Sequence, residues 1–102
     1  MSHHYPAAID LVTAIRLLDG LAVPRIAETA LVDLLQAVDG SGNREHLADY
    51  LGQAKGMVKG LLIGNLLTSV QADQVRSIYE DLGATKFHSW HKTSHAKGHA
   101  SA

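Results

Sequence analysis

The sequence predicts an all-α protein: a small bundle of four helices, or five if the third breaks near Gly52, with a disordered His- and Lys-rich C-terminal tail. Alanine and leucine contribute 14 residues each, whereas valine and isoleucine together contribute 12, and this balance favours helix over strand. Apolar residues recur at steps of three and four, with no sustained alternation. The 102 residues suit one domain. We expect it over 1–88, followed by a flexible tail over 89–102.

Pro6 and Gly20 are the predicted limits of the first helix, because proline suits a first helical turn and glycine a left-handed C-terminal cap. The second helix is predicted from Pro24 to the turn residues at 39–42. Both predicted helices carry an apolar stripe suited to packing on a core. These stripes are Ala8, Leu11, Ile15 and Leu18, and then Ala27, Ala30, Leu31, Leu34, Leu35 and Val38.

Asn43 can cap a third helix, and Thr68 with Gln71 has the form of a capping box that opens a last one. We expect Gly83 to end that last helix. Beyond Lys86 the chain is mostly His, Lys, Ser, Thr, Ala and Gly, which can bury little. The apolar positions of these two helices are Leu47, Tyr50, Leu51, Ala54 and Val58, and then Val75, Ile78, Tyr79 and Leu82.

Composition excludes several classes of protein. Hydrophobic residues make up 46% and charged residues 19%, unlike a wholly disordered chain. Cysteine is absent, which excludes disulfide scaffolds and thiolate metal sites. The formal charge of −1 disfavours general coating of nucleic acid. We expect a cytoplasmic protein, since there is no secretory signal and no apolar run of about 20 residues. No reaction motif is present, so we expect neither an enzyme nor a cofactor.

Small residues recur at every fourth position between Ala48 and Gly64, with glycine at 52, 56, 60 and 64. Interior glycine costs a helix about 1 kcal/mol relative to alanine. In a single helix, close approach of another helix would offset that cost. That helix could belong to the same chain, to a second copy or to another protein, and the sequence leaves these alternatives open.

The same segment resembles the helix-turn-helix of DNA-binding repressors over about twenty residues. Ala48, Gly52, Val58 and Leu61 stand where that motif has a small residue, a turn glycine and two apolar residues. The resemblance implies a second helix from near Ala54 that presents Lys55 and Lys59 to DNA. Gln53 departs from the pattern, and residues 44–65 carry a surplus of only one positive charge, so attraction to phosphate is slight.

The tail contains weak candidates for metal binding. Its histidines are three, four and four positions apart, and imidazole is a common metal ligand. A solvated tail explains the same residues, because ordering a mobile segment costs conformational entropy. We therefore expect no metal site. The four residues are His88, His91, His95 and His99.

These patterns favour a small regulatory or adaptor protein that binds another protein, itself, or both, for example as an antagonist that covers a partner's interaction surface. The glycines at 52, 56, 60 and 64, which we call the glycine stripe, and the neighbouring apolar residues at 61–63 and 66–67 favour self-association as a homodimer. The alternative is a helix-turn-helix transcriptional regulator that uses Lys55 and Lys59. The predicted partner-binding residues are Gly52, Gly56, Gly60, Gly64, Leu62, Ile63 and Leu66.

Overall fold

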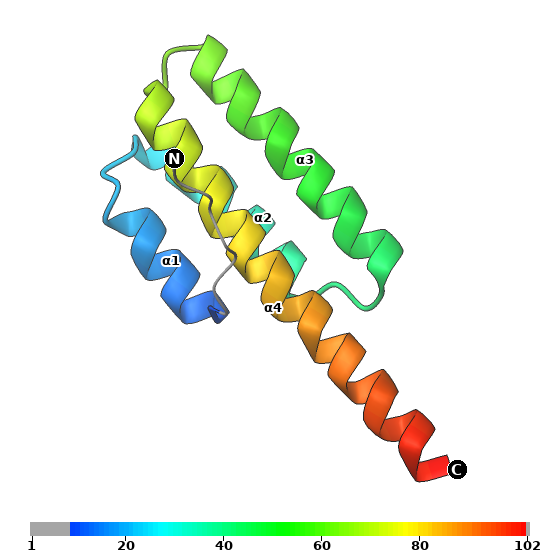
Figure 1. Ribbon diagram of the computed structural model, residues 1–102. Coiled ribbons are helices and arrows are strands. Elements are labelled where there is room, and N and C mark those ends of the chain that lie inside the picture. The colour runs from blue at the N-terminus through cyan, green and yellow to red at the C-terminus, as the bar shows by residue number, and fades with distance from the viewer. Residues whose placement is uncertain (1–8, 102) are drawn as a thin grey trace, which may run out of the picture.

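Four helices make up the computed structural model, which describes the backbone of residues 9–101 and the side chains of residues 9–90 (Figure 1). This confirms the all-α class and the count of four helices. In chain order the helices are α1 (Leu11–Asp19), α2 (Arg25–Asp39), α3 (Arg44–Ile63) and α4 (Ser69–Ser101).

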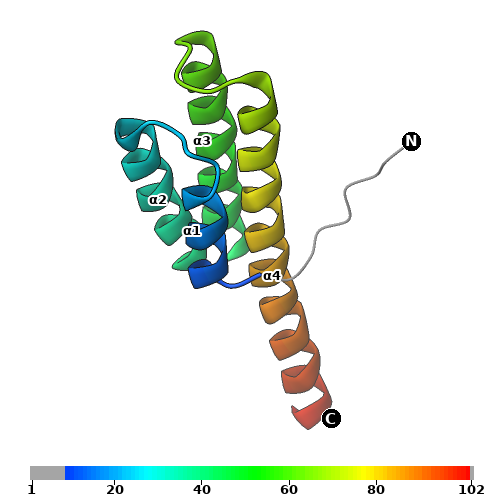
Figure 2. The ribbon, with the colours of Figure 1, turned by 90° about the vertical axis from the view of Figure 1, so that its left-hand side faces the viewer.

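Helix α4 lies in the middle of the bundle and contacts each of the other three helices. In Figure 1 it crosses in front of α2, with α1 on one side and α3 on the other. Figure 2 shows the same arrangement from the side, with α1 in front of α3. Helices α1 and α3 therefore lie on opposite sides of α4, and α3 contacts only α2 and α4.

The apolar stripes predicted from the sequence form the core. The predicted faces of α2 and α4 are almost wholly buried. Each fully buried leucine or valine stabilises the fold by about 1.5–3 kcal/mol relative to an exposed one. The largest fully buried side chains are Leu18, Leu31, Leu35, Leu82, Val38, Val58 and Val75.

The limits of α1 differ from the prediction. Ile9 and Asp10 are not helical, so the helix begins at Leu11 rather than at Pro6, and Pro6 and Ala8 lie outside the described residues. Asp10 is the N-cap, since its carboxylate accepts a hydrogen bond from the Thr13 backbone N–H at 2.8 Å. The side chain of Thr13, and then its backbone N–H, lower the pKa of Asp10 because both stabilise the charged carboxylate by hydrogen bonding.

Gly20 is also not the left-handed cap that was predicted, because its φ of −68° is right-handed. The left-handed residue of this turn is Ala22, with a φ of 55°. After α3 the corresponding residue is Asn65, with a φ of 62°. Asparagine tolerates this conformation better than alanine does, so the strain lies at Ala22.

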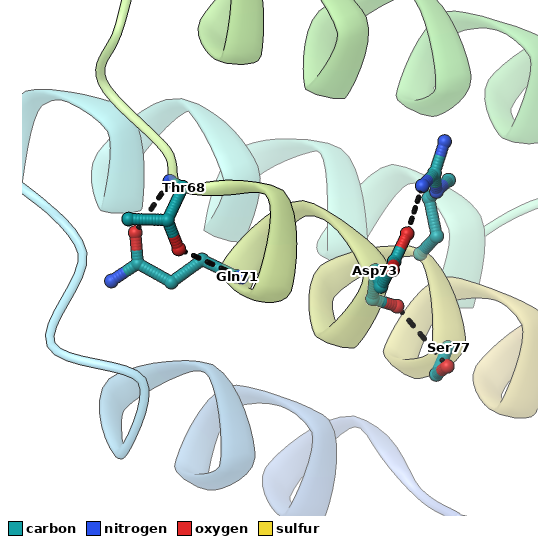
Figure 3. Close-up of polar contacts among 5 residues, drawn as sticks. Thr68, Gln71, Asp73 and Ser77 are labelled. Carbon is teal, nitrogen blue, oxygen red and sulfur yellow. Dashed lines mark hydrogen bonds and ion pairs between the residues drawn. The ribbon is translucent and has the colours of Figure 1, made fainter.

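The predicted capping box at the start of α4 is present (Figure 3). The Thr68 backbone N–H donates to Gln71 Oε1 at 2.9 Å, and the Gln71 backbone N–H donates to Thr68 Oγ1 at 3.1 Å. Gln71 Nε2 also donates to the Leu21 carbonyl oxygen at 3.0 Å, which ties α4 to the turn after α1. One turn further on, Asp73 forms an ion pair with Arg76. The Asp73 carbonyl oxygen accepts a hydrogen bond from the Ser77 hydroxyl at 3.1 Å (Figure 3).

The prediction that Gly83 ends the last helix is wrong. Helix α4 continues through Gly83, which is buried where α3 and α4 pack together. A Cβ atom at this position would lie 3.0 Å from Leu51 Cδ1, so glycine lets the two helices approach closely. Further along α4, Trp90 is half-buried against the core. The flexibility expected of 89–102 stays a prediction.

We expect Ala22→Gly to stabilise the fold. Glycine removes the left-handed strain of alanine, which outweighs its greater freedom in the unfolded chain, and the gain is about 0.5–1 kcal/mol in the free energy of unfolding. Urea denaturation measures it. The control is Ala30→Gly inside α2, which should lose about 1 kcal/mol. A loss of similar size at both positions would contradict the assignment of strain to Ala22.

Candidate protein-binding face of α3

Residues 44–63 form one uninterrupted helix. Asn43 caps it as predicted, and its side-chain oxygen accepts a hydrogen bond from the His46 backbone N–H at 2.9 Å. There is no turn at Gly52, so of the alternatives that the sequence left open the chain adopts the single helix, without the helix-turn-helix geometry and without a break into a fifth helix. Lys55 and Lys59 are exposed on this single helix, and DNA binding through them stays a prediction without that motif.

One side of α3 packs on the core. Leu47, Ala54 and Val58 are buried there, against α2 and α4. Leu62, a predicted partner-binding residue, is half-buried and packs against the same core. It is therefore at least partly a structural residue.

The opposite side is exposed. With 3.6 residues per turn, six residues project away from the buried Leu47, Ala54 and Val58, and every one of them is exposed. We call these residues the outer face of α3. They are Glu45, Asp49, Gly52, Gly56, Gly60 and Ile63.

The three glycines of the outer face touch nothing else in the described part of the chain. A Cβ atom built at Gly52, Gly56 or Gly60 would meet no atom within 4 Å. Packing against the described residues of the same chain, one of the three alternatives that the sequence left open, therefore does not account for them. Their cost to helix stability, about 1 kcal/mol each, is not offset in the monomer.

Gly64 differs from the other three glycines. It is the C-terminal cap of α3, and its backbone N–H donates to the Gly60 carbonyl oxygen at 2.9 Å. A Cβ atom there would lie 3.3 Å from that same oxygen. Gly64 therefore helps to end the helix, and it does not extend the outer face.

Exposed apolar side chains gather at the turn between α3 and α4. Ile63 is 72% exposed and Leu66 is 38% exposed. Both were predicted to bind a partner, and a partner-binding residue must be accessible. Val70, in the first turn of α4, is 67% exposed. Val70 was not among the predicted partner-binding residues, although it is the apolar residue inside the predicted capping box.

Charges are divided along α3. Glu45 and Asp49 lie in its N-terminal half, and Lys55 and Lys59 lie in its C-terminal half. All four side chains are exposed. A further charge at the N-terminal end, Arg44, lies over the ring of Phe87, 5.0 Å from its centroid. The rest of the exposed side is therefore acidic at one end and basic at the other.

A hollow of about 170 Å³ lies in the groove between α3 and α4. Leu51, Ala54 and Val58 line it from α3, and Tyr79 lines it from α4. Lys55, Arg76 and Glu80 contribute charged groups to its lining. An apolar cavity of about 150 Å³ can hold a benzene ring, so the hollow has room for one apolar side chain of a partner.

The histidine candidates are only partly within the described side chains. His88 is exposed, and the side chains of His91, His95 and His99 lie outside that part of the chain. Among the described residues, no three His, Cys, Asp or Glu side chains are grouped to hold a metal ion. Within the same residues, no helix is long and apolar enough to span a membrane. No protein-family model, curated protein or solved structure matches the chain.

Replacing the outer-face glycines with alanine should stabilise the monomer. Gly52→Ala, Gly56→Ala and Gly60→Ala each add a methyl group that meets nothing, and each should add about 0.5–1 kcal/mol to the free energy of unfolding. Urea denaturation at low protein concentration measures this effect without contribution from association.

The matched control is Gly83→Leu. It places a large side chain against Leu51 and should cost about 1–3 kcal/mol through overpacking. Outer-face alanine variants that lose stability would show that these glycines have an internal role after all.

Proposed function

We propose that this protein acts by binding another protein through the outer face of α3, as a small regulatory or adaptor protein. The observation that carries the proposal is that Gly52, Gly56 and Gly60 lie inside a helix and are exposed, and that no atom of the described residues lies within 4 Å of a Cβ position there. A helix that only packs within this bundle would be more stable with alanine at all three positions.

Association with another helix can offset the cost of the outer-face glycines to helix stability. Without side chains at the middle of the outer face, the backbone of a second helix can approach closely, which increases dispersion contacts and permits Cα–H···O bonds. Ile63 and Leu66 add exposed apolar surface at one end of the face. The partner surface that fits this face is therefore a helix.

Such a protein can regulate a partner by covering a helix that the partner needs for another contact. The outer face spans most of a 20-residue helix, which corresponds to a length of about 30 Å. Occupying a partner helix over that length would block its own dimerisation or substrate surface. This antagonist role follows from binding alone and requires no chemical step.

Gly56→Leu tests the proposal. The added side chain should hold the partner helix away and weaken binding at least about tenfold. It should leave the fold intact, because nothing lies within 4 Å of the Cβ position. The measurement is affinity capture from the native host with wild type and variant side by side, followed by titration of the purified partner. Circular dichroism checks the fold.

The control for this test is Gln36→Leu, which adds the same exposed apolar side chain to α2. It should bind the partner as wild type does. A partner retained equally by Gly56→Leu and wild type would contradict the proposal, and so would a chain that retains no protein and does not self-associate.

A further inference from the structure

We infer that the outer face of α3 binds a second copy of this chain, with the two α3 helices antiparallel and a two-fold axis near Gly52. The inference rests on the proposed function and names its partner. It is carried by the positions of the charges on the exposed side of α3 rather than by the glycines alone.

The charges are antisymmetric about Gly52. Glu45 and Lys59 both lie seven positions from Gly52, and Asp49 and Lys55 both lie three positions from it. In an antiparallel pair centred on Gly52, residues at equal distances on either side lie at the same level. Glu45 then lies opposite the lysine at 59 in the second copy, and Asp49 lies level with the lysine at 55, across the width of the interface.

The two-fold axis repeats each of these pairings, so every one of the eight charges lies level with an opposite charge. A parallel second copy in register would place like charges together, which is unfavourable. Antiparallel packing also places each helix N-terminus beside the partner's C-terminus, where the helix dipoles attract. A two-fold pair is the commonest form of homo-oligomer.

The small residues of α3 are also arranged symmetrically about Gly52. Ala48 and Gly56 both lie four positions from Gly52, so the smallest side chains face one another across the axis. All three positions are exposed, and close backbone approach is possible along the centre of the pair. Lysine side chains are long enough to lie across bare glycine positions and reach the acids of the second copy.

The exposed apolar end of α3 also has a counterpart on the second copy. Ile63 lies eleven positions after Gly52, and eleven positions before Gly52 is Ser41, next to Gly42. Gly42, Asn43, Arg44 and Trp90 line a hollow at that end of α3. In the antiparallel pair, Ile63 of each copy, which is 72% exposed, therefore lies level with the hollow of the other.

Disulfide trapping tests the orientation directly. The chain has no cysteine, so single variants Ala48→Cys and Gly56→Cys introduce one thiol each. Oxidised alone, each should cross-link poorly. Mixed in equal amounts, they should form the mixed dimer well above the 1:2:1 ratio of random pairing. Mass spectrometry separates the three products, because the two variants differ in mass.

The control replaces one of the two variants with Gln36→Cys, whose thiol lies on α2. This mixture should give the ratio of random pairing, which shows that random collision does not produce an excess of mixed dimer. Dimers formed mainly by Ala48→Cys with itself and by Gly56→Cys with itself would overturn the antiparallel arrangement. A random ratio for the Ala48→Cys and Gly56→Cys mixture would overturn it as well.

Charge exchange tests the pairing. Glu45→Lys with Asp49→Lys makes the exposed side wholly basic, and Lys55→Glu with Lys59→Glu makes it wholly acidic. Each double variant alone should self-associate at least about tenfold more weakly than wild type in sedimentation equilibrium, and an equal mixture should recover the association. Asp33→Lys on α2 controls for a change of charge elsewhere. Unchanged self-association in both double variants would overturn the pairing.

The inference can fail while the proposed function survives. A wild-type chain that stays monomeric at millimolar concentration overturns the second copy as partner. If Gly56→Leu still loses a captured partner in that case, the outer face binds a different protein. If Gly56→Leu changes neither self-association nor capture, both proposals are wrong.

Discussion

Packing against α4 is the constraint that fixes the rest of this fold. Helix α4 contacts all three other helices, and one specific interaction ties it to each neighbouring segment. The buried Tyr79 hydroxyl donates to the Leu31 carbonyl oxygen of α2 at 2.5 Å. Burial raises the pKa of Tyr79, which favours the protonated hydroxyl that this hydrogen bond requires. Gln71 holds the turn after α1, and Gly83 lets α3 approach closely. These contacts place α1 and α3 on opposite sides of α4 (Figure 1).

A bundle arranged in this way leaves α3 at its edge. Helix α3 has α2 and α4 on one side only, so half of its surface needs no apolar residue for folding. Charged residues with high helix propensity usually occupy such a surface. Here the middle of the surface carries Gly52, Gly56 and Gly60 instead, which lowers helix stability without a gain inside the chain. This conflict between local propensity and the fold is the kind expected at functional sites.

How much the sequence could predict depends on whether the relevant contacts are local. The caps at Asn43 and Thr68 were predictable because capping depends on residues three positions apart. The buried faces of α2 and α4 followed from periodicity in the same way. Gly83 was mistaken for a helix end because its role depends on Leu51, 32 positions away in the sequence. The glycine stripe is visible in the sequence, but periodicity shows only which residues share a side of the helix. That this side faces away from the core depends on how α3 packs against α2 and α4.

Small residues and charges contribute differently to an interface on α3. Glycine allows close approach, but a bare helix surface fits many helices equally well and carries no information about direction. The charges at 45, 49, 55 and 59 add little affinity at an exposed site, yet they discriminate between antiparallel and parallel neighbours because one arrangement pairs opposite charges and the other pairs like charges. The glycines therefore allow close approach, and the charges determine the direction of the neighbouring helix. An alanine in place of glycine should therefore stabilise the monomer and weaken the complex, whereas a charge reversal should change the complex and leave the monomer almost unchanged. That difference in response separates residues kept for folding from residues kept for association.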